Sequence, residues 1–137
     1  MNHPTSKIAA AATVILLAAG AGVQALNAQP APAVKRTILL KQEMTIPGRE
    51  AVMAVVELPP GSAEGRHSHP AEVFAIMLEG TISLEVEGKP TATLKAGEIF
   101  YIAPGSVHQA VNNSTAPAKL EAVFVAEKGK PLTTPAP

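Results

Sequence analysis

Glycine and proline interrupt the chain at intervals of about ten residues from residue 36 onward, and this punctuation limits the fold more than any other feature. The segments between the interruptions are short and rich in aliphatic and β-branched residues, which favour strands. Eight segments are predicted as strands: 36–40, 51–58, 73–79, 81–86, 91–94, 99–102, 108–112 and 120–125. The pattern predicts an all-β sandwich or barrel with no amphipathic helix after residue 35.

The predicted strands differ in how much of their surface they bury. Apolar and polar residues alternate in 81–86, so this strand should have one solvated face. The segment 73–78 has no polar residue, which predicts cover on both faces, by the barrel interior and by a second sheet or subunit. Phe74, Ile76 and Leu78 would share the outward face, and we therefore expect at least a homodimer.

Residues 1–28 have the three parts of a secretory signal peptide: a short basic start, an uncharged apolar stretch and an exit through small residues. Cleavage is expected after Ala25 or Ala28. The alternative is a permanent membrane anchor, but the apolar run is shorter than the ~20 residues that span a bilayer. We expect export to the periplasm, with secretion as the second choice, and no stable membrane insertion.

Removing the signal leaves 137 − 28 = 109 residues, enough for one domain. Residues 29–35 alternate proline with small residues and are predicted to form an extended linker. The barrel is expected to occupy residues 36–126, and the proline-containing segment 127–137 is expected to be a loose C-terminal tail. The chain has no cysteine, so packing, a metal or oligomerisation has to supply the stability that disulfides give many exported domains.

The net charge argues against nucleic acid as a partner. Lysine plus arginine and aspartate plus glutamate both number 11, and loss of Lys7 with the signal leaves a charge near −1. Such a surface attracts neither polyanions nor acidic membranes. The expected partner is a small molecule.

Three histidines remain after the signal: His67, His69 and His108. Residues two apart on a strand share a face, so the first two imidazoles should point the same way. Imidazole is the commonest protein ligand for transition metals, and three on neighbouring strands could hold one divalent ion of iron, manganese, nickel, zinc or copper. The alternatives are that the histidines are satisfied core residues, or that the pocket binds a ligand without metal.

Two segments carry a resemblance to a known family. Residues 61–80 read GSAEGRHSHPAEVFAIMLEG and residues 97–112 read GEIFYIAPGSVHQAVN. They resemble the first and second cupin motifs, in the order and with the short spacing of small single-domain bacterial cupins of the cupin 2 conserved barrel type. The resemblance implies a small double-stranded β-helix, or jelly-roll, barrel that holds a metal ion through the three histidines.

The resemblance fails at the carboxylate ligand. Counting back from Gly80, the position of the family's glutamate is held by Val73, and Glu72 stands one residue early. Strand parity also places Val73 on the face of His67 and His69. Either Val73 fills this position, which leaves a site of three neutral imidazoles, or a bulge near Pro70 turns Glu72 inward as a fourth ligand.

Three further residues are weaker candidates for substrate binding: Arg66, Tyr101 and Gln109. The function implied by the resemblance is an exported small metalloprotein that binds or transforms a small molecule, with dioxygenase-like or isomerase-like chemistry by family analogy. The alternatives are a non-catalytic periplasmic cupin that binds a ligand or metal, and a structural module whose apolar outer face assembles an oligomer. Fold alone does not choose between them.

Overall fold

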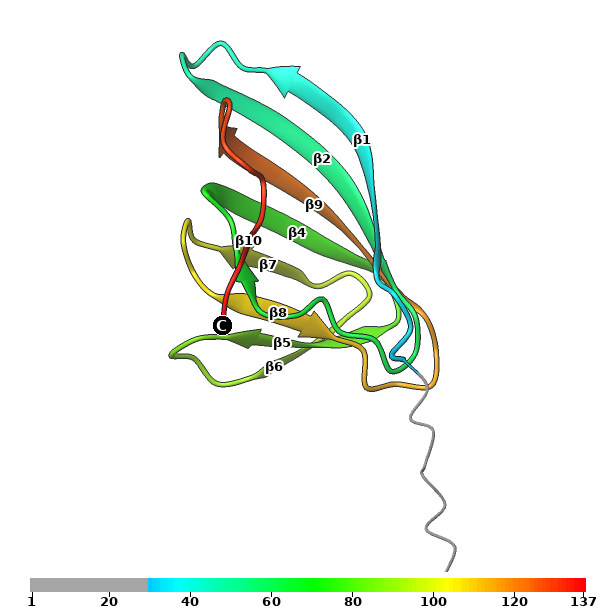
Figure 1. Cartoon of the computed structure of the whole chain (residues 1–137). Helices are drawn as coiled ribbons and strands as arrows, with labels where there is room; N and C mark the ends of the chain where they lie inside the picture. The colour runs from blue at the N-terminus through cyan, green and yellow to red at the C-terminus, as the bar shows by residue number, and fades with distance from the viewer. Residues whose placement is uncertain (1–29) are drawn as a thin grey trace, which may run out of the picture.

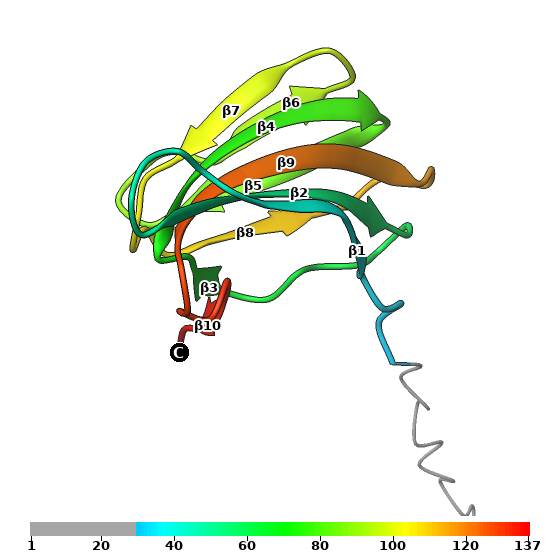
Figure 2. The same cartoon turned by 90° about the horizontal axis from the view of Figure 1, so that it is seen from above.

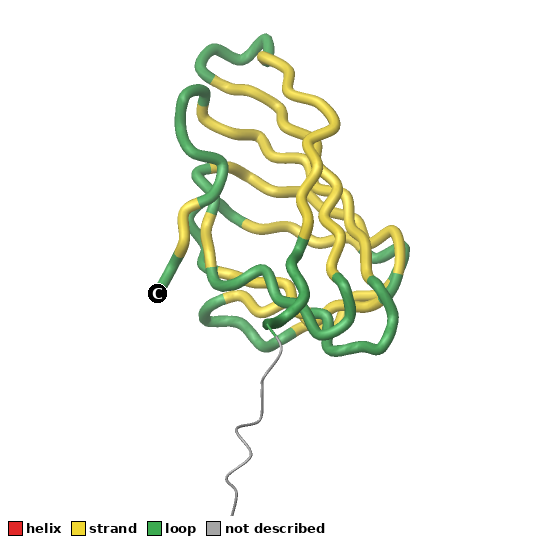
Figure 3. Tube along the Cα trace, turned by 45° about the vertical axis from the view of Figure 1, so that its right-hand side comes forward, coloured by secondary structure: helices red, strands yellow, loops and turns green. Residues whose placement is uncertain are grey.

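The computed structural model describes residues 30–137, which form two five-stranded antiparallel sheets (Figures 1 and 2). The first sheet has the order β1 (Lys35–Glu43), β2 (Arg49–Leu58), β9 (Ala118–Glu127), β4 (Ala71–Glu79) and β7 (Ile99–Ile102). The second has the order β10 (Thr134–Pro135), β3 (His67–Ser68), β8 (His108–Val111), β5 (Thr81–Val86) and β6 (Ala92–Lys95). Strands joined by turns and loops make up this whole part of the chain (Figure 3). The predicted all-β fold is confirmed.

All eight predicted strands are present, with bounds shifted by a few residues. The sequence did not predict β3 or β10, which contain two residues each and pair with each other. Within residues 30–137 there is no helix long and apolar enough to cross a membrane. The predicted signal peptide lies outside the described residues.

The core lies between the sheets because their strands alternate inward and outward residues. In β4, Val73 and Met77 are buried whereas Phe74 and Ile76 are exposed. The inner face of β9 carries Leu120, Phe124 and several alanines in the same alternation. The small alanine side chains of the two strands leave room between the sheets near Phe124.

The β4–β5 turn is fixed by a close approach of two backbone segments at Gly80. Its φ is +72°, and a Cβ placed on it would lie 2.9 Å from the Cα of Ala118 and also collide with the carbonyl oxygen of Pro117. Only glycine fits such a position without strain. The absence of a side chain at Gly80 therefore lets the end of β4 pack closely against the start of β9.

Asn112 holds the far end of β8. This side chain is fully buried, and its amide nitrogen donates to the carbonyl oxygens of Leu58 and Ala116 at 2.9 and 2.8 Å. Its amide oxygen accepts from the backbone N–H and the hydroxyl of Ser114. With all four bonds made, the turn after β8 is rigid, and this fixes the strand that carries His108.

Candidate metal centre

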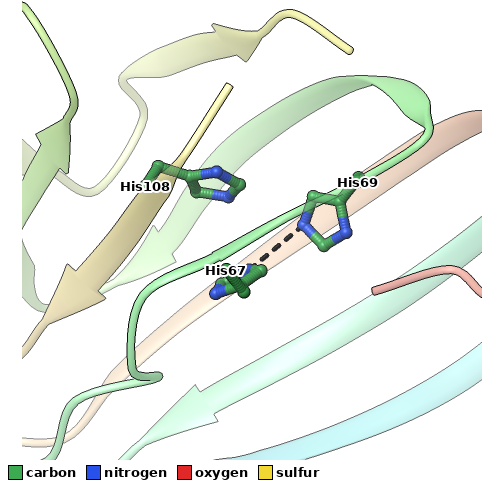
Figure 4. A group of neighbouring side chains, drawn as sticks. All are labelled: His67, His69 and His108. Carbon is green, nitrogen blue, oxygen red and sulfur yellow. Dashed lines mark hydrogen bonds between the residues drawn. The ribbon is translucent and has the colours of Figure 1, made fainter. Parts of the chain in front are cut away.

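His67, His69 and His108 converge in the interior (Figure 4). His67 on β3 lies directly opposite His108 on β8 in the antiparallel ladder. His69 follows β3, where the chain leaves the second sheet to enter β4 of the first. The ring centroids are 4.4 Å apart for His67 and His108, 4.7 Å for His67 and His69, and 5.1 Å for His69 and His108. All three residues are buried, and one ring nitrogen from each lies within 4.8 Å of the others.

Each histidine donates a hydrogen bond from its Nδ1 atom to a backbone carbonyl oxygen. The pairs are His67 with Gly65 at 2.8 Å, His69 with Leu132 at 2.7 Å and His108 with Ser106 at 2.9 Å. A carbonyl oxygen can only accept, so Nδ1 carries the proton in each neutral ring. The Nε2 atoms are then left with bare lone pairs. This is the tautomer of a metal-ligating histidine whose ring is oriented by an outer hydrogen bond.

In the neutral tautomers set by the carbonyl contacts, the lone pairs of two of these rings face each other with no proton between them. Nε2 of His67 lies 3.2 Å from Nε2 of His69, the contact dashed in Figure 4. Two acceptors at this distance repel each other in a buried site unless a cation lies between or beside them. The donor set therefore fits a transition-metal ion that prefers nitrogen ligands.

Burial keeps the rings of His69 and His108 neutral. Desolvation lowers the pKa of His69 from 6.5 to about 4, assisted by the neighbouring His67 and opposed by the hydrogen bond to Leu132. Burial likewise lowers the pKa of His108, with the hydrogen bond to Ser106 acting in the opposite direction. At neutral pH these two rings therefore offer lone pairs with no proton to displace.

The structure places Val73 on the cavity side of β4 and Glu72 on the outside. Val73 is 4% exposed and lines the cavity beside His67 and His69, whereas Glu72 is exposed to solvent. Regular alternation runs from Ala71 to Leu78, so no bulge turns Glu72 inward. The position that holds a carboxylate in the family motif is thus filled by a hydrocarbon side chain.

The histidines line a cavity of about 30 Å³. This is room for about one or two water molecules, since a water needs at least about 10–15 Å³ on this measure. The walls are mostly apolar, from residues such as Val73, Phe100 and Phe124. Two charged residues also line it, Arg36 and Glu64, and neither was among the sequence-based candidates.

Arg36 is the only inward-turned side chain of β1, whose other residues are all exposed. Its Nη1 donates to Thr133 Oγ1 at 2.8 Å, and its guanidinium carbon lies 5.8 Å from the centre of the Phe124 ring. Its Nη2 is 3.9 Å from Glu64 Oε1, an ion pair longer than a hydrogen bond. Glu64 Oε2 accepts from the backbone N–H of Ala110 at 3.2 Å.

None of the three weaker candidates lines the histidine cavity. Arg66 is half exposed and pairs with Glu87 at 3.0 Å on the surface. Tyr101 lies on the outer face of β7, where its ring centroid is 5.3 Å from that of Phe74. Gln109 donates to the carboxylate of Glu85 at 2.6 Å across the β5–β8 ladder.

The C-terminal segment folds back onto the site, in contrast to the loose tail expected from its composition. Thr134 and Pro135 form β10 and pair with β3, and the backbone N–H of Ala136 donates to the carbonyl oxygen of Arg66 at 2.9 Å. Just before β10, Leu132 supplies the carbonyl oxygen that holds His69. A backbone acceptor has no side-chain signature, so the sequence gives no sign of this contact.

Two facing antiparallel sheets with a buried histidine cluster define a double-stranded β-helix protein with a candidate metal centre. The cupin domain model Cupin_2 matches residues 54–125, just over half of the chain. The chain belongs to this cupin family.

A curated relative, germin-like protein subfamily 2 member 1 of Arabidopsis thaliana, is 35% identical over 91 residues, which cover 59% of this chain and 41% of the relative. The chain thus spans less than half the length of that protein. A solved conserved protein with a double-stranded β-helix domain from Klebsiella pneumoniae superposes with a TM-score of 0.65 at 22% identity, covering 80% of this chain and 90% of the other. A predicted oxalate decarboxylase from Thermotoga maritima matches at 26% identity with a TM-score of 0.59, covering 68% and 80%.

Proposed function

We propose that this protein is an exported small cupin metalloprotein that holds one divalent metal ion through His67, His69 and His108, and that it binds or transforms a small molecule. The observation that carries the proposal is that Nδ1 of each of the three clustered rings contacts a backbone carbonyl oxygen, which leaves Nε2 of each neutral ring unprotonated. When bound, the metal would supply Lewis-acid or redox chemistry. The dioxygenase-like and isomerase-like classes follow from family likeness alone.

The donor set favours some metals over others. Three imidazole nitrogens with a valine in the carboxylate position carry no negative charge. Hard cations such as manganese gain most from an anionic oxygen ligand, so its absence favours zinc, nickel or copper. The protein's own part is to hold the rings through the three backbone carbonyls and to surround the ion with hydrocarbon walls.

Elemental analysis tests the proposal. Protein exported to the periplasm and purified without added metal is expected to contain about one transition-metal ion per chain, bound by the three ligands. Mass spectrometry of the same sample checks export, because the mature chain should begin at Leu26 or Gln29. A chain that lacks metal and also fails to take up added zinc would contradict the metalloprotein proposal.

A second candidate function is metal or ligand binding without turnover, in the same compartment. The small volume of the cavity, about 30 Å³, favours the metal-binding form of this alternative, because an organic molecule of several atoms does not fit inside without movement of the walls. Turnover of any member of a small-molecule panel by metal-loaded protein would exclude this alternative.

We further propose that the outer face of β4 and β7 forms a homodimer interface. Phe74 is 50% exposed and Ile99 76% exposed, and with Ile76 and Tyr101 they line a continuous apolar groove. A patch of this kind on a small domain is typical of a subunit contact.

Sedimentation analysis at micromolar concentration should therefore give a dimer, and Ile76→Glu should dissociate it by burying a charge. Leu39→Glu, at an exposed aliphatic residue of β1 outside the groove, is the control and should remain dimeric. A monomeric parent protein, or dissociation only in the β1 variant, would refute this interface.

A further inference from the structure

We propose that Arg36 anchors the anionic head of a small carboxylate ligand at the inner end of a groove leading to the histidine cavity. The inference deepens the proposed function, on which it rests, by naming the chemical class of the ligand. It is carried by three features: an arginine with unused donors, a groove that reaches it from outside, and a histidine site with no negative ligand.

Most of the hydrogen-bonding capacity of Arg36 is unused. A guanidinium has five N–H donors, and among residues 30–137 the side chain makes one hydrogen bond, to Thr133. Its Nε is buried and has no hydrogen-bond partner within residues 30–137. A buried donor without a partner is unfavourable, so a ligand that accepts from it is favoured.

The guanidinium is nevertheless held in place. Thr133 fixes one end, and the ring of Phe124 lies 5.8 Å from its centre. Glu64 neutralises it only in part, because the 3.9 Å separation leaves the ion pair without a hydrogen bond. A carboxylate can form two parallel bonds with such a planar group, and the fixed side chain loses little freedom when it binds.

A route from the surface reaches this residue. A groove of about 470 Å³ lies between the C-terminal segment and the loop before β3. Arg36, Glu64 and His67 line both this groove and the inner cavity, so they form the boundary between the two. A carboxylate head could meet Arg36 at that boundary while the rest of the ligand occupies the groove.

The charge of the metal centre favours the same ligand class. With Val73 in the carboxylate position, a divalent ion held by the three imidazoles would have no negative protein ligand to offset its charge in a buried site. An incoming anion reduces that charge and also pairs with Arg36. A neutral ligand of the same shape gains neither interaction.

Nuclear magnetic resonance of the ¹⁵N-labelled full chain tests the inference, with acetate as the probe and acetamide as its neutral analogue. In the zinc-loaded protein, acetate should shift the Nε–H signal of Arg36. This signal is assigned as the one that is missing from the spectrum of Arg36→Lys. Acetamide should leave the signal in place. Arg36→Gln should weaken acetate binding at least about tenfold while changing zinc affinity less than about threefold. Glu64→Gln should strengthen acetate binding severalfold by removing a like charge.

Arg49→Gln is the matched control. Like Arg36, Arg49 lies 3.9 Å from a glutamate oxygen, that of Glu127. Arg49 begins β2, however, whereas Arg36 pairs with Val56 near the end of that strand. Its acetate affinity should equal that of the parent. Equal binding of acetate by Arg36→Gln, or an equal response to acetamide, would overturn the inference while leaving the metal site intact. Failure to bind zinc would instead contradict the proposed function. The same acetate titration of the metal-free protein would then test the role of Arg36 by itself, and an unmoved Nε–H signal would contradict that role.

Discussion

Replacing His69 with alanine is expected to lower the affinity for zinc by about a hundredfold or more. Within residues 30–137 the candidate centre has three histidine ligands, and changes to outer hydrogen-bond partners alone typically cost 10–100-fold, so loss of a direct ligand should cost at least as much. His67→Ala and His108→Ala should behave alike, since all three rings have the same tautomer and burial. Competition with a chromophoric chelator at neutral pH measures the three affinities.

Two variants of β4 are the controls for this result. Glu72→Gln should leave zinc affinity within about twofold of the parent, because Glu72 is exposed on the outer face. Val73→Glu should add a carboxylate beside the histidines and increase affinity for manganese or iron. It should also lower the stability of the metal-free protein, because it buries an acid where a valine packs. Loss of zinc from Glu72→Gln equal to that of the histidine variants would mean that Glu72 is a ligand.

Gly80→Ala is expected to destabilise the domain by about 3 kcal/mol or more. The φ of +72° alone costs an alanine about 1–2 kcal/mol, and its Cβ would also lie 2.9 Å from the Cα of Ala118. The two nearest atoms, the carbonyl oxygen of Pro117 and the Cα of Ala118, belong to the backbone, so β4 and β9 would have to separate. Thermal unfolding of the metal-free protein should show a fall in melting temperature of about 15 °C.

Gly88→Ala is the matched control for the backbone strain. Gly88 has a φ of +76°, nearly that of Gly80, but a Cβ there would meet nothing within 4 Å. Its melting temperature should therefore fall only by the amount the φ angle accounts for, about 5–10 °C. Equal losses in the two variants would show that the close approach to residues 117 and 118 is unimportant.

Much of this fold could be predicted from the sequence because its turns and strands are determined by residues that lie close together in the chain. The turns require glycine or proline at particular positions, and alternation within strands such as β5 follows from the pleat. The parity argument that separated Val73 from Glu72 used the same two-residue period, and the burial of β4 follows it from Ala71 to Leu78. The three histidines were found because residue type and spacing carry their chemistry.

The remainder depends on contacts between residues far apart in the chain. Arg36 was overlooked because one arginine on an otherwise exposed strand is indistinguishable in sequence from a surface residue. The short strands β3 and β10 need each other as partners, and their composition alone does not favour strand. Of the weaker candidates, Arg66 precedes β3 and lines the outer groove but not the histidine cavity. Tyr101 lies on the outer face of β7, and Gln109 follows His108 in β8 and so points to the opposite face of that strand.

The support that Leu132 gives to His69 also determines when the centre can be completed during synthesis. The two residues are 63 positions apart, and Leu132 also follows His108 by 24 residues. His67, His69 and His108 therefore emerge from the ribosome well before the carbonyl group that orients one of them. A nascent chain can bring the imidazoles together, but it fixes the ring of His69 only after Leu132 has been added and has folded back beside it. Metal capture with full affinity thus has to wait for a segment made well after the last of the three histidines.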